Sequence, residues 1–155
     1  MTDASSSADP DNSLGYQVRR CHRRFDRLLG GKLSEYNLKP GFWYYLRILW
    51  RDDGVSQRFL SDMTYVAENT TATMIGAMVE AGLVQRERDE QDRRKFKVSL
   101  TDKGRALEDR SLHHVQEINA IATRGIAQED WQHCLTILRR MAENLEAEAE
   151  GRDAG

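Results

Sequence analysis

The sequence predicts a mainly α-helical fold in which one β-hairpin interrupts a series of helices. Two observations lead to this prediction. Apolar residues recur every three or four positions through most of the chain, the period of an amphipathic helix, and between residues 83 and 100 the period falls to two, as in a strand. The 155 residues suit one ordinary domain, and the predicted order of elements is α-α-α-α-β-β-α-α.

The N-terminal part predicts a tail followed by a long helix. Residues 1–12 are acidic and Ser-rich without apolar periodicity, so we expect a disordered tail. Ser13 can cap a helix. The helix then carries an apolar stripe at near-heptad spacing, formed by Leu14, Val18, Cys21, Phe25 and Leu28. The two glycines at 30 and 31 predict fraying or a kink before Asn37.

Three further helices are predicted before the hairpin. Pro40 suits the first turn of an aromatic-rich helix that ends at Gly54. A short helix follows over residues 56–64, and another over 68–81. Gly82 is a natural stop for the last of these.

The hairpin and the C-terminal helices complete the predicted order. Residues 83–88 form the first strand, 89–92 a polar turn and 93–100 the second strand. The alternating apolar face of the second strand comprises Phe96, Val98 and Leu100. Thr101 opens a helix that Gly125 breaks, and a last helix starts near Gln128.

Composition excludes several classes of function. A formal net charge of −2 lacks the bulk basic signal of nucleic-acid binders, so any such function must rest on local charge. The two cysteines form no CxxC motif or Cys/His cluster, and we expect no metal and no cofactor. We find no nucleophile–base pairing and no phosphate-binding loop, which argues against an enzyme. Without a membrane-length apolar run or a signal peptide, we expect a cytoplasmic protein.

Two short helices followed by a two-stranded wing form the pattern of a winged helix-turn-helix. The two segments that carry this pattern read LSDMTYVAENTTATMIGAMVEAGLVQR and RDEQDRRKFKVSLTDKG. With Asp92 two residues before Arg94, then Leu100, Thr101 and Gly104, they resemble the MarR (multiple antibiotic resistance regulator) family. The resemblance implies a DNA-binding transcriptional regulator, and we expect a repressor.

The predicted DNA contacts lie on the helix over 68–81 and on the wing. The N-terminal side chains of that helix are placed to read base edges in a major groove, and they are Asn69, Thr70 and Thr73. The cations of the wing are Arg86, Arg88, Arg93, Arg94, Lys95 and Lys97. The resemblance implies that Arg94 enters the minor groove and that Asp92 orients the arginines of the tip. Ala67 leaves the helix start under-capped.

The terminal helices predict a homodimer. We assign residues 13–37 and 105–150 to dimerisation helices and 38–104 to the winged module. The winged module is too small to cover all the apolar faces of these helices. We therefore expect those faces to be buried against a second copy of the chain. Two-fold symmetry then predicts a palindromic double-stranded DNA operator.

A small aromatic effector is the expected signal. The resemblance implies a site between the dimerisation helices and the winged module, and the candidate lining is His22, Trp43, Arg47, Trp50, Phe59 and His113. Flat rings bury well against such side chains, although aromatics at helical spacing also suit a core. Two alternatives remain: a redox-sensing repressor that uses Cys21, which the apolar stripe predicts to be a buried thiol, and an interaction module that does not bind DNA.

Overall fold

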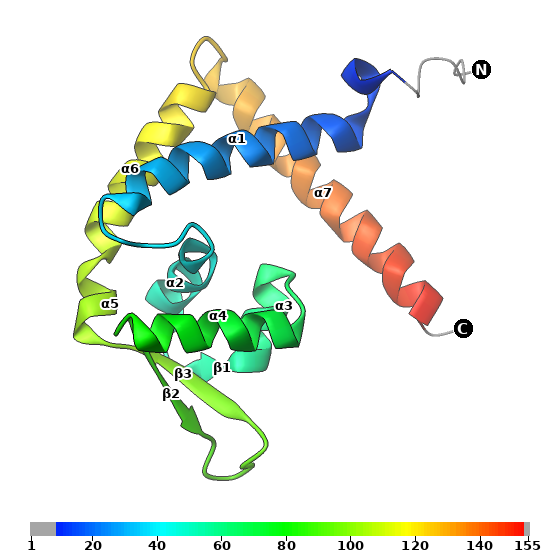
Figure 1. The fold of residues 1–155 in the computed structure, drawn as a ribbon. Coiled ribbons are helices and arrows are strands. Elements are labelled where there is room, and N and C mark those ends of the chain that lie inside the picture. The colour runs from blue at the N-terminus through cyan, green and yellow to red at the C-terminus, as the bar shows by residue number, and fades with distance from the viewer. Residues whose placement is uncertain (1–8, 154–155) are drawn as a thin grey trace. The chain divides into compact units, whose positions relative to one another are not determined.

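The computed structural model describes residues 9–153, which form two units that meet between Ile118 and Asn119 (Figure 1). Residues 1–8 of the predicted tail lie outside the described residues. The rest of that tail is not structureless, because Pro10–Asn12 form a 3-10 turn, η1. Asp9 caps it by accepting the backbone N–H of Asp11 at 3.1 Å.

Helix α1 spans Leu14–Ser34 and begins at Ser13, whose hydroxyl accepts the backbone N–H of Tyr16. The sequence predicted fraying or a kink at glycines 30 and 31, but the helix does not fray there and continues through both. Leu29 and Leu33 on the flanking turns are buried and hold this stretch against the core. Burial of the apolar face therefore outweighs the low helix propensity of glycine.

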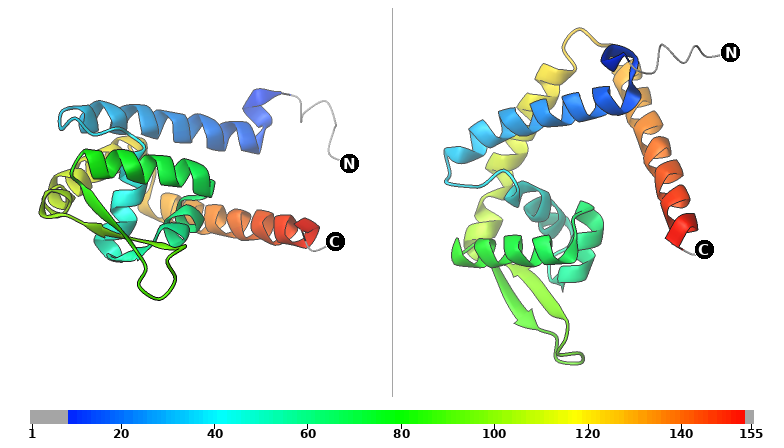
Figure 2. Two further views of the ribbon diagram at one scale, coloured as in Figure 1. Left: turned by 60° about the horizontal axis from the view of Figure 1, so that its bottom comes forward. Right: turned by 45° about the vertical axis from the view of Figure 1, so that its right-hand side comes forward.

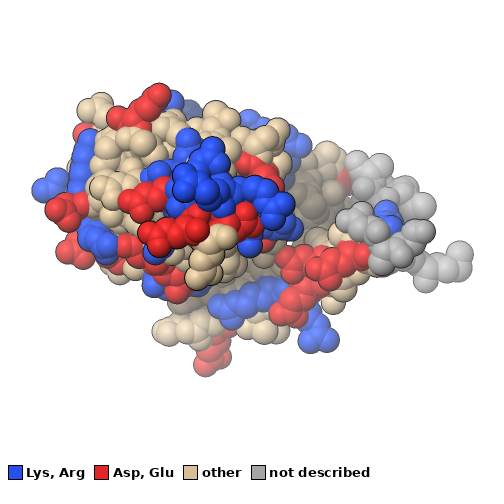
Figure 3. Space-filling model, turned by 90° about the horizontal axis from the view of Figure 1, so that it is seen from below, with Lys and Arg blue, Asp and Glu red and all other residues tan. Residues whose placement is uncertain are grey.

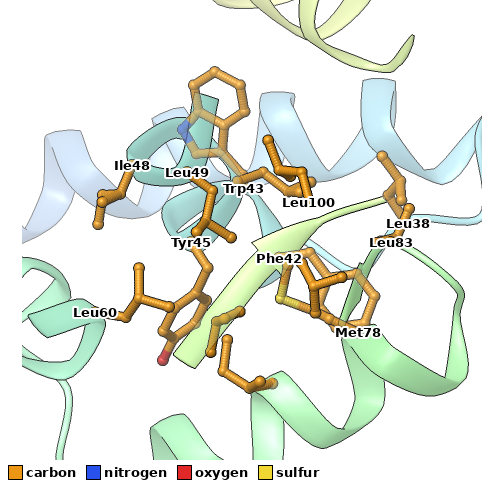
Figure 4. Close-up of a cluster of buried hydrophobic side chains, with 14 of the residues drawn as sticks. Leu38, Phe42, Trp43, Tyr45, Ile48, Leu49, Leu60, Met78, Leu83 and Leu100 are labelled. Atoms are coloured by element: carbon orange, nitrogen blue, oxygen red, sulfur yellow. The ribbon is translucent and has the colours of Figure 1, made fainter. Parts of the chain in front are cut away.

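Helix α2, Phe42–Arg51, runs through the centre of the first unit. Six of its ten residues are buried, namely Phe42, Trp43, Tyr45, Leu46, Ile48 and Leu49. Figure 4 shows several of them gathered with Leu60, Met78, Leu83 and Leu100 from the elements around α2. The aromatic spacing of this helix thus forms a core, and the winged module folds around it.

The sheet has three antiparallel strands in the order β1-β3-β2. The hairpin strands β2, Val84–Arg88, and β3, Phe96–Leu100, pair with Val84 opposite Leu100 and Arg88 opposite Phe96. The two-residue strand β1, Val55–Ser56, adds to the other edge of β3 and was not predicted.

The hairpin tip is longer than predicted. The second strand begins at Phe96 instead of residue 93, because Asp89 and Lys95 close the tip with turn hydrogen bonds. The backbone N–H of Asp89 donates to the carbonyl of Lys95, and the N–H of Lys95 donates to that of Asp92, both at 2.9 Å. Arg93, Arg94 and Lys95 consequently lie in the loop, and both views of Figure 2 show this hairpin projecting beyond α4.

The other helices are α3, Gln57–Thr64; α4, Glu68–Glu80; α5, Asp102–Ala106; α6, Glu108–Ala122; and α7, Gln128–Asp153. The helix predicted from Thr101 is broken at Leu107, which separates α5 from α6. The second unit consists of the end of α6 and α7. None of the described helices combines the length and apolarity needed to cross a bilayer.

Candidate nucleic-acid interface

The turn between α3 and α4 is fixed by its own hydrogen bonds. Tyr65 adopts a left-handed conformation with φ of 56°, which reverses the chain after α3. The buried Ser61 donates its hydroxyl to the carbonyl of Val66 at 2.6 Å, and its own carbonyl accepts the N–H of Val66. This bracing sets the angle at which α4 leaves the turn.

Helix α4 has one buried side and one exposed side. Thr71, Ile75 and Met78 are fully buried. The predicted reading residues Asn69, Thr70 and Thr73 are exposed on the opposite side. The sequence-predicted contact residues of this helix are therefore available together on one face.

The start of α4 lacks a capping side chain at Ala67, as the sequence predicts. Asn69 compensates in part, because its Oδ1 accepts the backbone N–H of Thr70 at 2.8 Å. The acidic Glu68 pairs with Arg58 of α3 at 3.6 Å, with both side chains exposed. The acid that the sequence places near the expected phosphates is thus matched by a neighbouring cation.

A hollow of 390 Å³ flanks the exposed side of α4. It is lined by Lys39, Asn69, Thr70, Thr73, Met74 and Ala77. Lys39 comes from the loop between α1 and α2, and the sequence analysis did not select it. Its position directly before Pro40 indicates only a loop, so the sequence could not show that Lys39 lies beside α4.

The tip of the wing holds one arginine in a defined position. The Asp92 carboxylate accepts three N–H groups of Arg94: the backbone N–H and Nε at 3.1 Å and Nη2 at 3.4 Å. These bonds to Arg94 hold the pKa of Asp92 below its usual range. The Arg94 side chain nevertheless stays 91% exposed.

A second acid builds the same loop. Asp89 accepts the backbone N–H groups of Asp92 at 3.0 Å and Gln91 at 2.8 Å, and these bonds, the one from Asp92 first, lower the pKa of Asp89. Figure 3, seen from below with the wing toward the viewer, shows a group of basic side chains bordered by acidic ones. The acids of the tip therefore have a structural role, and the cations Arg93, Arg94 and Lys95 remain exposed.

Arg86 and Arg88 brace the wing. Both guanidiniums lie over the Phe96 ring, at 5.1 and 5.0 Å from its centre. Arg86 also donates to the carbonyl of Ala72 in α4 at 3.3 Å, and Arg88 donates to the carbonyl of Arg93 at 2.6 Å. These contacts fix the hairpin to α4 and shape its tip, a role that the sequence analysis did not assign to them.

Lys97 lies on β3, opposite Glu87 of β2 and Ser56 of β1. It is exposed and sits against Gly54, where a Cβ would come 3.0 Å from the Lys97 Cε. It is therefore displaced along the strand from the cations of the tip.

The six predicted effector residues are not brought together as one lining. Trp43 is buried and makes an edge contact with Trp50 at 5.6 Å between ring centres, and the Trp50 indole donates to the Gly104 carbonyl at 3.0 Å. The other four lie on four different helices, α1, α2, α3 and α6. His22 pairs with Asp26 at 3.2 Å, His113 pairs with Glu117 at 3.4 Å, and Arg47 and Phe59 are exposed on α2 and α3.

Cys21 is exposed, although its place on the apolar stripe predicted a buried thiol. The other members of the stripe are exposed as well: Leu14 by 62%, Val18 by 42%, Phe25 by 38% and Leu28 by 47%. The prediction failed for the single chain because the stripe faces away from the core that Leu29 and Leu33 enter.

Comparisons with known proteins agree with this geometry. The model of the MarR family matches residues 38–96, which include α2, α3, α4 and most of the hairpin. A MarR transcriptional regulator from Methanosarcina mazei Go1 is 32% identical, with a TM-score of 0.80 over 84% of this chain and 94% of that one. The chain belongs to the MarR family.

Two further proteins are similar to this chain, one in sequence and one in structure. The regulator TtmR of Methylorubrum extorquens is 28% identical over 97 residues, which are 63% of this MarR-family chain and half of TtmR's own length. A MarR family regulator from Listeria monocytogenes, solved in complex with a 26mer DNA, has a TM-score of 0.82 at 20% identity, over 88% of this chain and 91% of that one. The predicted family and the mainly helical winged fold are confirmed.

Proposed function

We propose that this MarR-family chain is a DNA-binding transcriptional regulator that acts as a homodimer. The observation that carries the proposal is the Asp92–Arg94 pair at the wing tip, which orients a cation that remains 91% exposed. A cation already held in place loses less conformational entropy on binding than a free one. An arginine so presented suits the narrow minor groove of an A·T-rich tract.

Helix α4 supplies the sequence-reading part of the proposal. Asn69, Thr70 and Thr73 are exposed on one face, and an α-helix fits the major groove of double-stranded DNA. Asn can pair with the edge of adenine, and Thr can contact a phosphate or a thymine methyl group. The related regulator from Listeria monocytogenes, which shares the fold, was solved with DNA.

The proposal of a dimer is supported by apolar side chains that are exposed in the single chain. In α1 these are the stripe residues Leu14, Val18, Phe25 and Leu28, and in α7 they are Leu135, Ile137, Leu138 and Leu145. Burial of such faces against a second copy stabilises the pair by roughly 25 cal/mol for each Å² of apolar surface removed from water. A symmetric dimer presents α4 twice and reads a palindromic operator.

The test compares Arg94→Ala with Arg152→Ala in a DNA-retention assay on the chain's own upstream region. Both arginines are exposed, and each pairs with one acid, Arg94 with Asp92 at 3.1 Å and Arg152 with Glu148 at 3.4 Å. Each substitution therefore removes one positive charge from the same kind of exposed ion pair. We expect Arg94→Ala to weaken binding by about 1–3 kcal/mol and Arg152→Ala to bind like the unaltered protein. Equal affinities for the two variants would contradict the role of the wing.

We further propose a repressor that a small aromatic acid releases from its operator. The support is the chemistry of α2, which carries the half-buried Trp50 and Tyr44 beside the exposed Arg47. Ring faces and a guanidinium are the groups that hold an aromatic carboxylate. An effector must also bind the DNA-bound and free conformations with different affinity.

A thermal-shift screen with aromatic acids, followed by the retention assay, tests the effector. At a hundredfold excess over its dissociation constant a true ligand adds about 2.7 kcal/mol to the free energy of unfolding. A ligand that raises the melting temperature and leaves DNA retention unchanged would contradict release. Loss of retention after peroxide treatment, prevented by Cys21→Ser, would favour the redox-sensing alternative.

A further inference from the structure

Five arginines form an exposed stripe along α1, which we call the arginine stripe: Arg19, Arg20, Arg23, Arg24 and Arg27. Together with Tyr16, Asp26 and Pro40 they line a hollow of 940 Å³. Within residues 9–153, Arg20 bonds to the Gln17 side chain and Arg24 to the Arg20 carbonyl, and no carboxylate lies within ion-pair distance of any of the five. So many neighbouring cations repel one another until an anion binds.

Within the arginine stripe, Arg19, Arg23 and Arg27 lie on the side of α1 opposite the apolar stripe, whereas Arg24 precedes Leu28 by four residues and borders it. Arg23 follows Leu14 by nine residues, which at 3.6 residues per turn is two and a half turns. The face that the proposed dimer buries and the face that carries Arg19, Arg23 and Arg27 therefore point in opposite directions. A second copy that covers Leu14 and Phe25 leaves these three arginines accessible.

The loop between α1 and α2 connects the arginine stripe to the reading face of α4. Pro40 borders the arginine-lined hollow and packs on α1, where a Cβ at Gly30 would lie 3.0 Å from its Cγ. The preceding residue, Lys39, lines the hollow beside α4. The following residue, Gly41, lies against α4, where its Cβ would come 2.9 Å from the Cε of Met74.

The wing contacts α4 at a different place. Arg86 bonds to the carbonyl of Ala72, and Ala72 does not line the hollow beside Lys39. Helix α4 thus contacts Arg86 of the wing and lies against the loop of Lys39 and Gly41, and this loop reaches the arginine stripe at Pro40.

We propose that the arginine stripe binds the phosphate backbone of double-stranded DNA. The proposal rests on the proposed function and extends its interface to α1. Guanidinium groups match phosphate oxygens with two parallel hydrogen bonds and carry their charge at any physiological pH. Such contacts position the protein and strengthen binding to every sequence equally.

The test measures how DNA affinity depends on salt. The variant is Arg19→Gln/Arg23→Gln/Arg27→Gln, and the matched control is Arg139→Gln/Arg140→Gln/Arg152→Gln, which removes three exposed cations of α7. The probes are a duplex of mixed sequence and a duplex from the chain's own upstream region, titrated between about 50 and 200 mM salt. Circular dichroism checks that both variants remain folded.

The slope of log affinity against log salt is negative, and each lost phosphate contact makes it less steep by about 0.9. Loss of three arginines in each of two copies therefore reduces the steepness by as much as about 5, equally for both probes, while the control keeps the slope of the unaltered protein. Arg23→Gln alone gives a smaller change in the same direction.

The outcomes separate this proposal from the proposed function. If the unaltered protein binds DNA and the stripe variant keeps both its affinity and its slope, the arginine stripe has no DNA contact and the proposed function stands. If the unaltered protein binds neither probe at low salt, both proposals are wrong. If the variant weakens dimerisation and keeps the salt slope, the stripe binds acidic residues of the second copy and the DNA contact is overturned.

Discussion

Gly104 lies so close to Leu83 that a Cβ at Gly104 would come 2.2 Å from the Leu83 carbonyl oxygen. The contact joins the first turn of α5 to the residue that precedes β2. Thr101 strengthens the junction, because its hydroxyl donates to the Gly82 carbonyl at 2.6 Å and accepts the Gly104 N–H at 3.1 Å. Trp50 adds its indole bond to the Gly104 carbonyl. The Thr101 to Gly104 part of the motif thus anchors the base of the wing to α2.

Gly104→Ala should therefore destabilise the fold. The added methyl group meets a backbone oxygen that cannot move without shifting the sheet, and overpacking of this kind costs about 1–3 kcal/mol. Gly31→Ala is the matched control, because a Cβ there meets nothing within 4 Å and α1 gains helix propensity worth roughly 0.5–1 kcal/mol. Urea unfolding measures both, and equal stability of the two variants would contradict the packing argument.

Asp53 makes a second anchor for the wing. Its Oδ1 accepts the backbone N–H groups of Gly54 at 2.9 Å and Leu100 at 2.8 Å, and its Oδ2 pairs with Arg105 of α5. Asp53→Ala leaves the partly buried N–H of Leu100 without this acceptor, at a cost of about 1–3 kcal/mol.

Asp52→Ala controls for the loss of a carboxylate next to Asp53. The Asp52 pair with Arg51, at 2.7 Å, is exposed, and such pairs contribute about 0–1 kcal/mol. Hydrogen exchange at the Leu100 amide should accelerate in Asp53→Ala and stay unchanged in Asp52→Ala. Acceleration in both variants would assign the effect to charge alone.

Helices with a long apolar period could be predicted from the sequence, and short elements fixed by tertiary contacts could not. The stripe of α1 and the alternation of β3 span enough residues to show a period. Strand β1 has two residues and therefore no period. The break between α5 and α6 lies at Leu107, where neither a glycine nor a proline stands next to it to mark the end of a helix.

The candidate site divides in the same way. The cations of the wing could be found as a cluster, and the exposed face of α4 follows from its buried residues. Which arginines brace the wing and which stay exposed at its tip depends on where the β-ladder ends. It ends at Phe96, and the Phe96 ring holds Arg86 and Arg88. The effector lining could not be predicted, because aromatic spacing suits a core and a pocket equally, and Trp43 is core.

The cluster around Glu117 should show a titration that depends on His114. The His114 ring bonds to Glu117 at 3.3 Å, and Lys32 lies 3.6 Å from the same carboxylate. The bond to His114 first, and then the charge of Lys32, lower the pKa of Glu117 from its ordinary value. The folded state gains stability from this shift above the ordinary pKa of a Glu and loses it as the pH falls through the lowered value.

NMR titration of the Glu117 carboxyl carbon measures this shift. We expect His114→Leu to move the midpoint back toward the ordinary value, and His113→Leu to move it less, because His113 contributes only through its charge at 3.4 Å. A larger shift in His113→Leu than in His114→Leu would show that the hydrogen bond is not the main cause.

A substitution in the exposed apolar stripe of α1 tests the proposed dimer directly. Leu28 is 47% exposed in the single chain, and burial of a leucine contributes about 1.5–3 kcal/mol. Leu28→Asp removes this contribution from both copies, so we expect the dimer dissociation constant to rise at least about a hundredfold. Met63→Asp on α3, where Met63 is 40% exposed, introduces the same charge away from α1 and should leave the constant unchanged. Sedimentation equilibrium measures both variants. If Leu28→Asp left the dimer dissociation constant unchanged, or if Met63→Asp raised it to the same extent, the apolar stripe of α1 would not form the interface.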